Sequence, residues 1–144
     1  MSGNRRPVEV AIAVRRPVGE YLVLLRSPEK LGYWHLVSGG VEWGEEPAAA
    51  AARELLEETG LVAAPQQLGD PLAYDLASDP EPVRARFPAG TERIVVWPFV
   101  AEAPEGWEPT LDHEHVEARW LGPEAAIALL EYPEPKELVR RAAV

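Results

Sequence analysis

The sequence predicts an α/β fold, a sandwich in which helices cover both faces of a β-sheet. Apolar runs of strand length alternate along the chain with segments made of strong helix formers, a pattern typical of this class. Prolines, 15 among the 144 residues, divide the second half of the chain into short elements. A chain of this length can bury a proper core, so we expect a single domain over residues 1–144.

Two buried strands are expected near the N-terminus, at Val8–Val14 and Tyr21–Arg26. Both are apolar runs, and the turn-forming segment Pro17–Gly19 joins them. A third strand-like stretch, Tyr33–Val37, leads into a pair of glycines. These runs predict the first part of the sheet.

A helix is predicted at about Pro47–Glu58. Pro is favoured at the first helical position, because its missing N–H would have no partner there. Glu46 would then be the N-cap, and the good helix formers Ala48–Ala52 follow. Gly60 stands where a left-handed C-terminal cap is wanted. The helix is expected to pack on the core through Ala48, Ala51, Ala52 and Leu55.

The second half is expected to complete the sandwich with further strands and short helices. The strands are predicted at Leu68–Leu76, Arg93–Ala101 and His115–Leu121, and the helices at Glu124–Leu130 and Glu134–Ala142. The segment Asp75–Thr91 is rich in Pro, Asp and Ala and indicates a loop. Within this loop, Val83–Phe87 suits a short strand.

The carboxylates of Glu54, Glu57 and Glu58 point in similar directions from the predicted helix. At 100° per residue they span an arc of roughly 100°. Like charges at this spacing destabilise a helix by roughly 0.2–0.5 kcal/mol per pair, and Arg53 alone cannot balance them. One interpretation is an ordinary solvated acidic face. The other, which the wider spacing favours, is a surface that holds a divalent cation.

These carboxylates belong to a longer motif that runs from Gly39 to Leu61. The segment contains Gly39, Glu45, the run Arg53-Glu54-Leu55-Leu56-Glu57-Glu58 and the closing Gly60-Leu61. It resembles the Nudix box, G-x5-E-x7-R-E-U-x-E-E-x-G-U with U a bulky aliphatic residue, at every specified position. The resemblance implies the Nudix α/β/α sandwich with a mixed β-sheet. It also implies a hydrolase of phosphate anhydrides, in which water attacks phosphorus and divalent cations offset the charge.

The resemblance assigns roles to residues of the box. It implies that Mg2+, with Mn2+ as an alternative, binds the carboxylates of Glu54, Glu57 and Glu58 and the carbonyl of Gly39. Glu54 is also expected to be a general base, and Arg53 is expected in the catalytic set, paired with Glu45. We expect Gly39 and Gly40 to allow a sharp turn and a close approach of the backbone to phosphate.

A second acidic cluster lies at Asp112–Glu117. Nudix proteins often supply an extra metal ligand or base from this region, so the resemblance implies Glu114 in that role, with Glu117 second. The alternative is that both carboxylates are solvated charges on an edge strand. His113 and His115 are expected to be surface histidines, because hard divalent cations prefer oxygen ligands.

Residues outside the box carry a looser resemblance to one subgroup, the dihydroneopterin triphosphate diphosphatases and their dATP pyrophosphohydrolase-like relatives. Trp34–Gly40 reads WHLVSGG, with Ser38 where many Nudix proteins have proline. The Arg84–Arg93 stretch, Arg-x-Arg-Phe-x-x-Gly-x-x-Arg, resembles the same subgroup. This resemblance implies a nucleoside or pterin triphosphate as the substrate, cleaved with release of pyrophosphate.

Several residues are candidate substrate contacts. They are Arg26, Trp34, Gly39, Gly40, Arg84, Arg86 and Arg93. The arginines suit forked contacts with distal phosphates, or else they are solvated or salt-bridged surface residues. Trp34 suits stacking on a base or pterin ring, or else burial. Trp43 has three open alternatives: it lines the mouth of the site, packs against its own chain, or forms a dimer contact.

The box does not choose among substrates, so other functions stay open. A dinucleoside polyphosphate and a nucleotide sugar of the ADP-ribose type are the alternative substrates. The non-enzymatic alternative is a domain that binds and senses nucleotides without hydrolysing them. The complete set of glutamates in the box argues against that last alternative, because degenerate sensors usually lose one.

Composition sets limits on partners and location. The formal net charge of −10 argues against nucleic-acid binding, which needs a basic face, but not against a phosphate substrate held through metal. The absence of cysteine excludes disulfides and thiolate metal sites. We see no signal peptide or membrane span, so we expect a cytoplasmic protein with a small phosphate-anhydride substrate and no membrane partner. A homodimer is left open.

Overall fold

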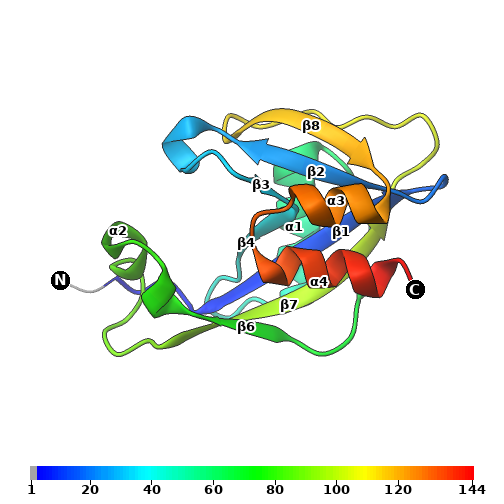
Figure 1. The fold of residues 1–144 in the computed structure, drawn as a ribbon. Helices are drawn as coiled ribbons and strands as arrows, with labels where there is room; N and C mark the ends of the chain where they lie inside the picture. The colour runs from blue at the N-terminus through cyan, green and yellow to red at the C-terminus, as the bar shows by residue number, and fades with distance from the viewer. Residues whose placement is uncertain (1–2) are drawn as a thin grey trace.

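A mixed β-sheet forms the middle layer of the protein, and helices cover both of its faces (Figure 1). The computed structural model describes residues 3–144. Its strands are β1 Val8–Arg16, β2 Glu20–Arg26, β3 Trp34–His35, β4 Val37–Gly40, β5 Gln66–Gln67, β6 Leu72–Asp75, β7 Arg93–Glu102 and β8 His115–Leu121. Its helices are α1 Pro47–Thr59, α2 Glu81–Arg84, α3 Pro123–Leu129 and α4 Pro133–Ala142, with 3-10 turns η1 Pro28–Lys30 and η2 Leu76–Ser78. In Figure 1, α1 lies behind the sheet and α3 and α4 lie in front of it.

One parallel pair makes the sheet mixed. Strands β1 and β7 run parallel, with Val8 opposite Val95 and Arg15 opposite Glu102. The other pairings between the described strands are antiparallel. The main path is β3-β2-β1-β7-β5, while β4 pairs with β1, β6 with β7 and β8 with β2. The predicted α/β/α sandwich with a mixed sheet is confirmed.

Strands β1 and β2 pair only next to the turn that joins them, which leaves the rest of each strand free to pair with β4 or β3. In β1, only Arg15 and Arg16 pair with β2. Strand β4 pairs with the first half of β1, where Gly39 lies opposite Val10. Strand β3 pairs instead with the end of β2. The glycine-containing strand β4 therefore lies beside the first half of β1, in contact with helix α1.

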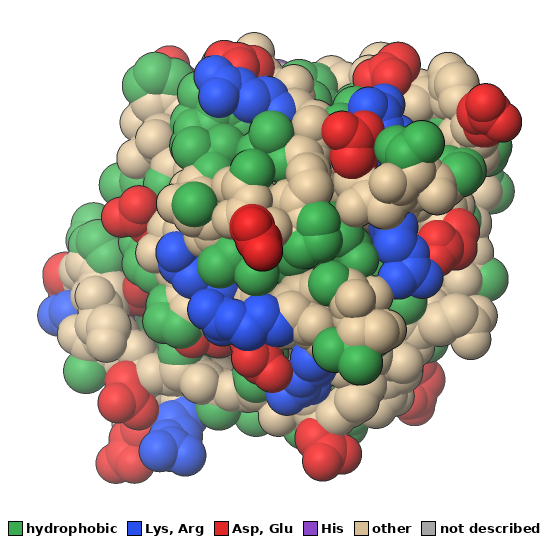
Figure 2. All heavy atoms as spheres, turned by 45° about the vertical axis from the view of Figure 1, so that its right-hand side comes forward, with side chains coloured by type: hydrophobic (Ala, Val, Ile, Leu, Met, Phe, Trp, Pro, Cys, Tyr) green, Lys and Arg blue, Asp and Glu red, His purple; other side chains and the backbone are tan. Residues whose placement is uncertain are grey.

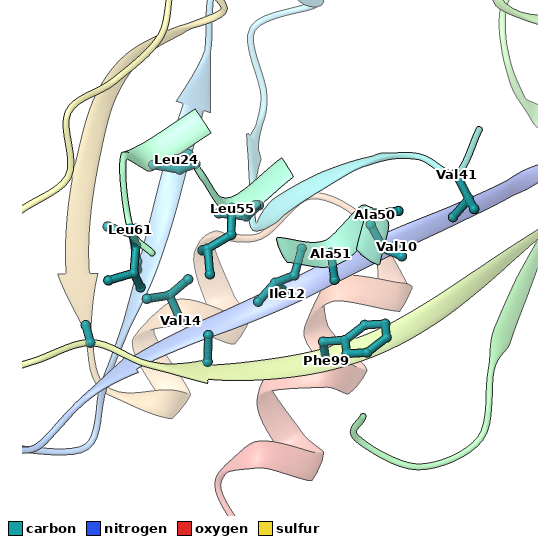
Figure 3. Close-up of a cluster of buried hydrophobic side chains, with 14 residues drawn as sticks. Val10, Ile12, Val14, Leu24, Val41, Ala50, Ala51, Leu55, Leu61 and Phe99 are labelled. Carbon is teal, nitrogen blue, oxygen red and sulfur yellow. The ribbon is translucent and has the colours of Figure 1, made fainter. Parts of the chain in front are cut away.

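Helix α1 packs on the sheet through small and aliphatic side chains (Figure 3). Ala50, Ala51 and Leu55 are buried against residues of β1 and β7. The expected core positions Ala51 and Leu55 are confirmed and Ala52 is half-buried, but the expectation for Ala48 is wrong, because it is exposed. Ala50 packs on the sheet, and a step of two residues turns Ala48 away from it by about 200°.

Replacing Leu55 with alanine is expected to lower the free energy of unfolding by about 2–5 kcal/mol, because it leaves a cavity in the core. Leu55 is 0% exposed, and alanine keeps the helix propensity high. Urea denaturation measures the change. The matched control is Leu56→Ala on the same helix, where the side chain is 51% exposed. We expect the control to cost no more than about 0.5 kcal/mol, and equal losses would contradict this assignment of the helix faces.

Helices α3 and α4 cover the opposite face of the sheet. Leu138 and Val139 of α4 are buried there, together with Leu130 at the end of α3. Both helices begin one residue before the predicted start, at Pro123 and Pro133. A proline is suited to this first position, so the boundary follows the same rule as the start of α1.

The segment Asp75–Thr91 differs from the prediction. In place of a strand at Val83–Phe87, it forms the 3-10 turn η2 and the short helix α2. Pro80 is the N-cap of α2 and Pro82 stands in its first turn, which presets the backbone for a helical turn. Phe87 is buried in a small separate cluster and fixes the end of this segment.

The other predicted strands are present with shifted ends. The strand predicted at His115–Leu121 coincides with β8, and β1, β2 and β7 extend their predictions by one or two residues. The strand predicted at Leu68–Leu76 shortens to β6, because Gly69 has a φ of 86° and bends the chain before it. The run Tyr33–Val37 divides between β3 and β4.

The surface carries charges of both signs. On the face shown in Figure 2, Lys and Arg side chains are interspersed with Asp and Glu side chains. Within residues 3–144, no helix is both long enough and apolar enough to cross a membrane. The expected absence of nucleic-acid and membrane partners stays a prediction.

Candidate active site

Helix α1 begins where the sequence predicts and ends one residue later than predicted, at Thr59. Glu46 is its N-cap, and Pro47 is its first residue. At the other end, Gly60 has a φ of 81°, and its N–H donates to the carbonyl of Leu56 at 2.9 Å. A residue with a Cβ atom is strained at this φ, so the glycine fixes where the helix ends. Glu54, Glu57 and Glu58, which we call the acidic cluster, lie in the last two turns before Gly60.

The carboxylates of the acidic cluster differ in burial. The side chain of Glu58 is 5% exposed and that of Glu54 is 13% exposed, whereas that of Glu57 is 56% exposed. Glu58 therefore forms the protein side of the cluster, and Glu57 forms its solvent side. The three carboxylates, predicted to share one arc of the helix, therefore extend from the core to the surface.

Gly39 lets strand β4 approach Glu54 closely. A Cβ atom at position 39 would overlap the carboxyl group of Glu54, so only glycine permits this approach. The expectation of a sharp turn at Gly39 and Gly40 is wrong, because both residues lie in extended β4, paired with β1. The chain turns further on, at Gly44, where φ is 81°.

Arg53 holds the segment after β4 against helix α1. Its Nε and Nη2 atoms donate to the two carboxylate oxygens of Glu45 at 3.0 and 2.9 Å. Nη2 also donates to the carbonyl of Gly40 at 2.9 Å, and Nη1 donates to Glu54 at 2.8 Å. The hydrogen bonds from Arg53 lower the pKa of Glu45. The expected pairing of Arg53 with Glu45 is present, and Arg53 also binds the carboxylate of Glu54.

Replacing Arg53 with lysine is expected to lower the free energy of unfolding by about 2 kcal/mol, because charge-assisted hydrogen bonds are lost. One ammonium group cannot reproduce the forked contact with Glu45 and also reach Glu54. Urea denaturation measures the difference. Arg140→Lys on the exposed side of α4 is the matched control, and we expect a change within about 0.5 kcal/mol for it. A loss no larger than the control's would show that these contacts stabilise nothing.

Glu58 is the most buried carboxylate of the cluster and lacks part of its hydrogen bonding. Among residues 3–144, its Oε1 and the Nε of Arg26 are the buried side-chain atoms without a hydrogen-bond partner. Burial raises the pKa of Glu58 well above its ordinary value, and Glu54 raises it further. Burial also raises the pKa of Glu54, against the lowering effects of Glu58 and Arg53. Both groups therefore favour a bound cation or proton over the bare anion.

Two histidines meet beside Glu58. His35 of β3 and His115 of β8 stack with their ring planes 15° apart, and their Nε2 atoms lie 2.7 Å apart. Burial lowers the pKa of His35 well below its ordinary value, and His115 adds to this effect. The expected surface position is wrong for His115, which is 6% exposed, because pairing of β8 with β2 turns this residue toward α1. His113 is exposed, as expected.

The sequence model of the NUDIX domain family matches residues 5–142. The chain belongs to the Nudix hydrolase family. Gly39–Leu61 is its Nudix box, and the acidic end of α1 beside Gly39 is the candidate site within it. The resemblance seen in the sequence is thereby confirmed at the level of the family.

Several proteins show what this Nudix chain is similar to. An octanoyltransferase of Myxococcus xanthus is 32% identical over 95% of this chain, which covers 36% of that protein. An 8-oxo-(d)GTP phosphatase of Mycolicibacterium smegmatis is 31% identical over 97% of this chain and 35% of that protein. An RNA pyrophosphohydrolase of Dinoroseobacter shibae is 32% identical over 71% of this chain and 68% of that protein. The chain spans about a third of the length of the first two proteins.

Solved structures share the Nudix fold of this chain. The E. coli dihydroneopterin triphosphate pyrophosphohydrolase is 23% identical, with a TM-score of 0.81 and 97% of each chain covered. A C. elegans Ap4A hydrolase is 24% identical, with a TM-score of 0.72 and 94% of each chain covered. At these identities the likeness concerns the fold alone.

Two candidate substrate contacts lie near the ends of neighbouring strands, Arg26 at the end of β2 and Trp34 at the start of β3. Arg26 Nη1 donates to the hydroxyl of Tyr33 at 2.8 Å, and the Arg26 guanidinium lies 5.2 Å from the centre of that ring. Trp34 packs into the cluster under α3 and α4, with Arg119 at 4.8 Å over its ring. Trp34 is therefore in the layer opposite α1, whereas Arg26 keeps an unpartnered donor within the described chain.

The other candidate arginines lie between β6 and β7 or at the start of β7. Arg84 pairs with Glu81 at 2.6 Å, and Arg93 pairs with Asp75 at 3.5 Å. Arg86 is exposed. These contacts agree with the alternative of salt-bridged surface residues, and a role in substrate binding stays a prediction.

The second acidic cluster reaches the Nudix site through Asp112, which sequence reasoning did not single out. Asp112 Oδ1 lies 2.6 Å from His115 Nδ1, and Asp112 is among the groups that raise the pKa of Glu58, after the larger effect of burial. Glu114 instead forms an ion pair with Lys30 at 3.5 Å, and its catalytic role stays a prediction. The spacing of three residues between Asp112 and His115 is the sequence signal that could have indicated this contact.

Trp43 packs against its own chain. Its Nε1–H donates to the carbonyl of Asn4, and the Arg6 guanidinium lies 5.9 Å from the centre of a Trp43 ring. The residue is still 61% exposed. Of the three alternatives for Trp43, packing against its own chain therefore describes its contacts in this structure.

Proposed function

We propose that the protein is a divalent-metal-dependent Nudix pyrophosphohydrolase, which cleaves a phosphoanhydride by attack of water on phosphorus. The observation that carries this proposal is the close approach of Glu54 to Gly39 beside the buried Glu58. Buried carboxylates are costly unless a cation or hydrogen bonds compensate them. Membership of the Nudix hydrolase family, with every specified position of the box intact, supports the same reaction class.

The donor set fits Mg2+, with Mn2+ as the alternative. Mg2+ prefers oxygen ligands and is usually held by one or two carboxylates together with substrate phosphates. Glu58 offers a buried oxygen that has no hydrogen-bond partner in residues 3–144. The residues that would hold the cation are Glu54, Glu57, Glu58 and the carbonyl of Gly39. When bound, such a cation offsets phosphate charge and lowers the pKa of coordinated water.

Residues of the chain would position the attacking water and take its proton. Glu54 suits the general base, because its carboxylate lies beside Gly39 at the proposed metal site, and burial raises its pKa. Its Oε1 accepts a hydrogen bond from Arg53 at 2.8 Å, which leaves Oε2 to accept the proton. Glu114, near the start of β8, is the second candidate for this base.

For the substrate we propose a nucleoside or pterin triphosphate, cleaved with release of pyrophosphate. The subgroup-like segments Trp34–Gly40 and Arg84–Arg93 support this choice. The fold shared with the E. coli dihydroneopterin triphosphate pyrophosphohydrolase over 97% of the chain agrees with it. Arg26 adds a cation with an unused Nε donor, suited to a distal phosphate.

The relatives define the competing substrates. An 8-oxo-(d)GTP phosphatase covers 97% of this chain at 31% identity and favours a damaged nucleoside triphosphate. RNA pyrophosphohydrolases are 32% to 47% identical over parts of the chain and favour an RNA substrate. The fold shared with an Ap4A hydrolase agrees with a dinucleoside polyphosphate.

A turnover panel tests the proposed function. The protein is assayed with Mg2+ or Mn2+ on nucleoside triphosphates, 8-oxo-dGTP, dihydroneopterin triphosphate, 5′-triphosphorylated RNA, Ap4A and ADP-ribose, and the products are identified. We expect the highest kcat/KM for a small triphosphate, with pyrophosphate as the product. Faster turnover of ADP-ribose than of any triphosphate would overturn the proposed substrate. Binding of nucleotides without turnover of any compound would favour the sensing domain.

A further inference from the structure

We propose that His35, His115 and Glu58 form a binding site for a transition-metal ion of the Zn2+ type. One ligand atom from each residue lies within 4.8 Å of the other two. The residues come from β3, β8 and α1, so the site lies where the sheet meets the helix. Two imidazoles and one carboxylate are a ligand set that known zinc sites use.

The surroundings of the two rings direct both Nε2 atoms toward this site. His115 Nδ1 lies 2.6 Å from Asp112 Oδ1, so Nδ1 carries the proton and donates a hydrogen bond to the carboxylate. His35 Nδ1 lies 3.3 Å from Ser38 Oγ, an oxygen that can accept a hydrogen bond in the same way. With both protons on Nδ1, both Nε2 atoms offer lone pairs to one point. Metal-bound histidines are held in this manner, with the outer N–H donated to an oxygen.

The metal-free arrangement leaves Glu58 unsatisfied. The Nε2 atoms lie 2.7 Å apart, so His35 must keep a proton on Nε2 and donate it to His115. Glu58 Oε1, at 3.6 Å from His115 Nε2, has no hydrogen-bond partner among the described residues. A metal ion between these atoms would satisfy all of them. The His115 side chain is 1% exposed and that of Glu58 is 5% exposed, so bulk water does not supply the missing hydrogen bond to Oε1.

Metal binding needs only a small movement of the rings. Zn–N distances of about 2.0–2.1 Å in a tetrahedral site place two nitrogens roughly 3.3 Å apart. The Nε2 atoms now lie 2.7 Å apart, so each ring would move by about 0.3 Å. Strands β3 and β8 both pair with β2, and side-chain rotation supplies this movement without a change in the sheet.

The site shares Glu58 with the proposed Mg2+ site and differs from it in chemistry. Mg2+ prefers oxygen ligands, whereas imidazole nitrogens suit Zn2+, Co2+ and Ni2+. An ion held by His35 and His115 would draw Glu58 out of the set proposed for catalysis, so Zn2+ should inhibit turnover. Binding itself does not depend on the proposed hydrolysis and is measured without substrate.

Equilibrium dialysis of Zn2+ against the protein tests the proposal, with and without excess Mg2+. The chain has three histidines and no cysteine, so a small set of variants covers its imidazole ligands. We expect one bound Zn2+ in the wild type and in His113→Gln, the matched control. His35→Gln and His115→Gln should each lose more affinity than the roughly 10–100-fold caused by losing an outer hydrogen bond. Equal binding in all four proteins would overturn the proposal.

Replacing Asp112 with asparagine should weaken Zn2+ binding at the same site without abolishing it. The amide keeps the shape of the side chain but weakens the hydrogen bond accepted from His115 Nδ1. We expect Zn2+ affinity to fall by about 10–100-fold while the His113→Gln control binds normally. An unchanged affinity would contradict the assignment of Asp112 as the outer partner.

15N NMR of the histidine rings in the wild-type protein tests the proposal even if the histidine variants do not fold. Zn2+ should shift the Nε2 resonances of His35 and His115 and leave those of His113 unchanged. No shift at either ring in excess Zn2+ would overturn the proposal and leave a plain hydrogen-bonded pair.

Glu57→Gln separates the two metal sites. Glu57 belongs only to the set proposed for Mg2+, so this variant should lose turnover and still bind Zn2+. If turnover is unaffected and Zn2+ binds, the assignment of Glu57 to the Mg2+ set fails and the histidine site stands. If Zn2+ binding disappears in this variant while the fold is intact, the histidine site as proposed is wrong.

Discussion

Replacing Glu54 with glutamine is expected to lower kcat by about 10²–10⁴-fold while the protein stays folded. The glutamine keeps the size of the side chain but cannot take a proton from water and is a weaker ligand for a cation. Glu54 is positioned for this role by the hydrogen bond from Arg53 at 2.8 Å and by the absence of a side chain at Gly39. The measurement is steady-state turnover of the best substrate, with a urea denaturation curve for each protein.

Glu105→Gln is the matched control for this substitution. Glu105 lies in an exposed turn far along the chain, so the same change of charge should leave kcat within about twofold. A Glu54→Gln enzyme with near-wild-type kcat would sink the assignment of Glu54. Unfolding of that variant would instead show that Glu54 is needed for structure.

Replacing Gly39 with alanine is expected to lower kcat by about 10²-fold, because misplacement of a catalytic group by about 1 Å has effects of that size. The new methyl group would overlap the Glu54 carboxyl group, and the end of that flexible side chain has to move aside. The backbone itself accepts alanine, since Gly39 lies in extended β4. Activity should therefore fall far more than stability.

Gly122→Ala is the control for the glycine substitution. Gly122 also lacks a positive φ, and a Cβ atom there would meet nothing within 4 Å. Its kcat should equal that of the wild type. If Gly39→Ala kept full activity, the close approach of β4 to Glu54 would have no role in the reaction.

Helix α1 could be predicted almost to the residue, because its signals are local. Pro47 at the first position and Gly60 after the last one act on their own backbone, with no need for distant partners. The pairing of Arg53 with Glu45 is present because the helix and the loop before it leave these residues within reach. The family followed from the same segment, since the spacing of the box is read directly from the sequence.

The features that could not be predicted depend on residues far apart in the chain. His35 and His115 are 80 residues apart, and only the pairing of β3 and β8 with β2 brings their rings together. Gly39 looked like a turn because glycine allows unusual φ values, but its lack of a Cβ atom is what the structure uses. At Val83–Phe87, prolines earlier in the segment favoured a helical turn over the short strand.

The parallel pairing of β1 with β7 has a consequence for synthesis on the ribosome. Val8 of β1 meets Val95, a partner that is translated 87 residues later, as the register of these strands requires. At roughly 5–20 residues per second, β1 would wait on the order of ten seconds before β7 emerges. During that time its apolar segment, Val10–Val14, has no permanent neighbour on that edge. Nascent chains of this protein should therefore be most prone to aggregation and most dependent on chaperones before Glu102 leaves the exit tunnel.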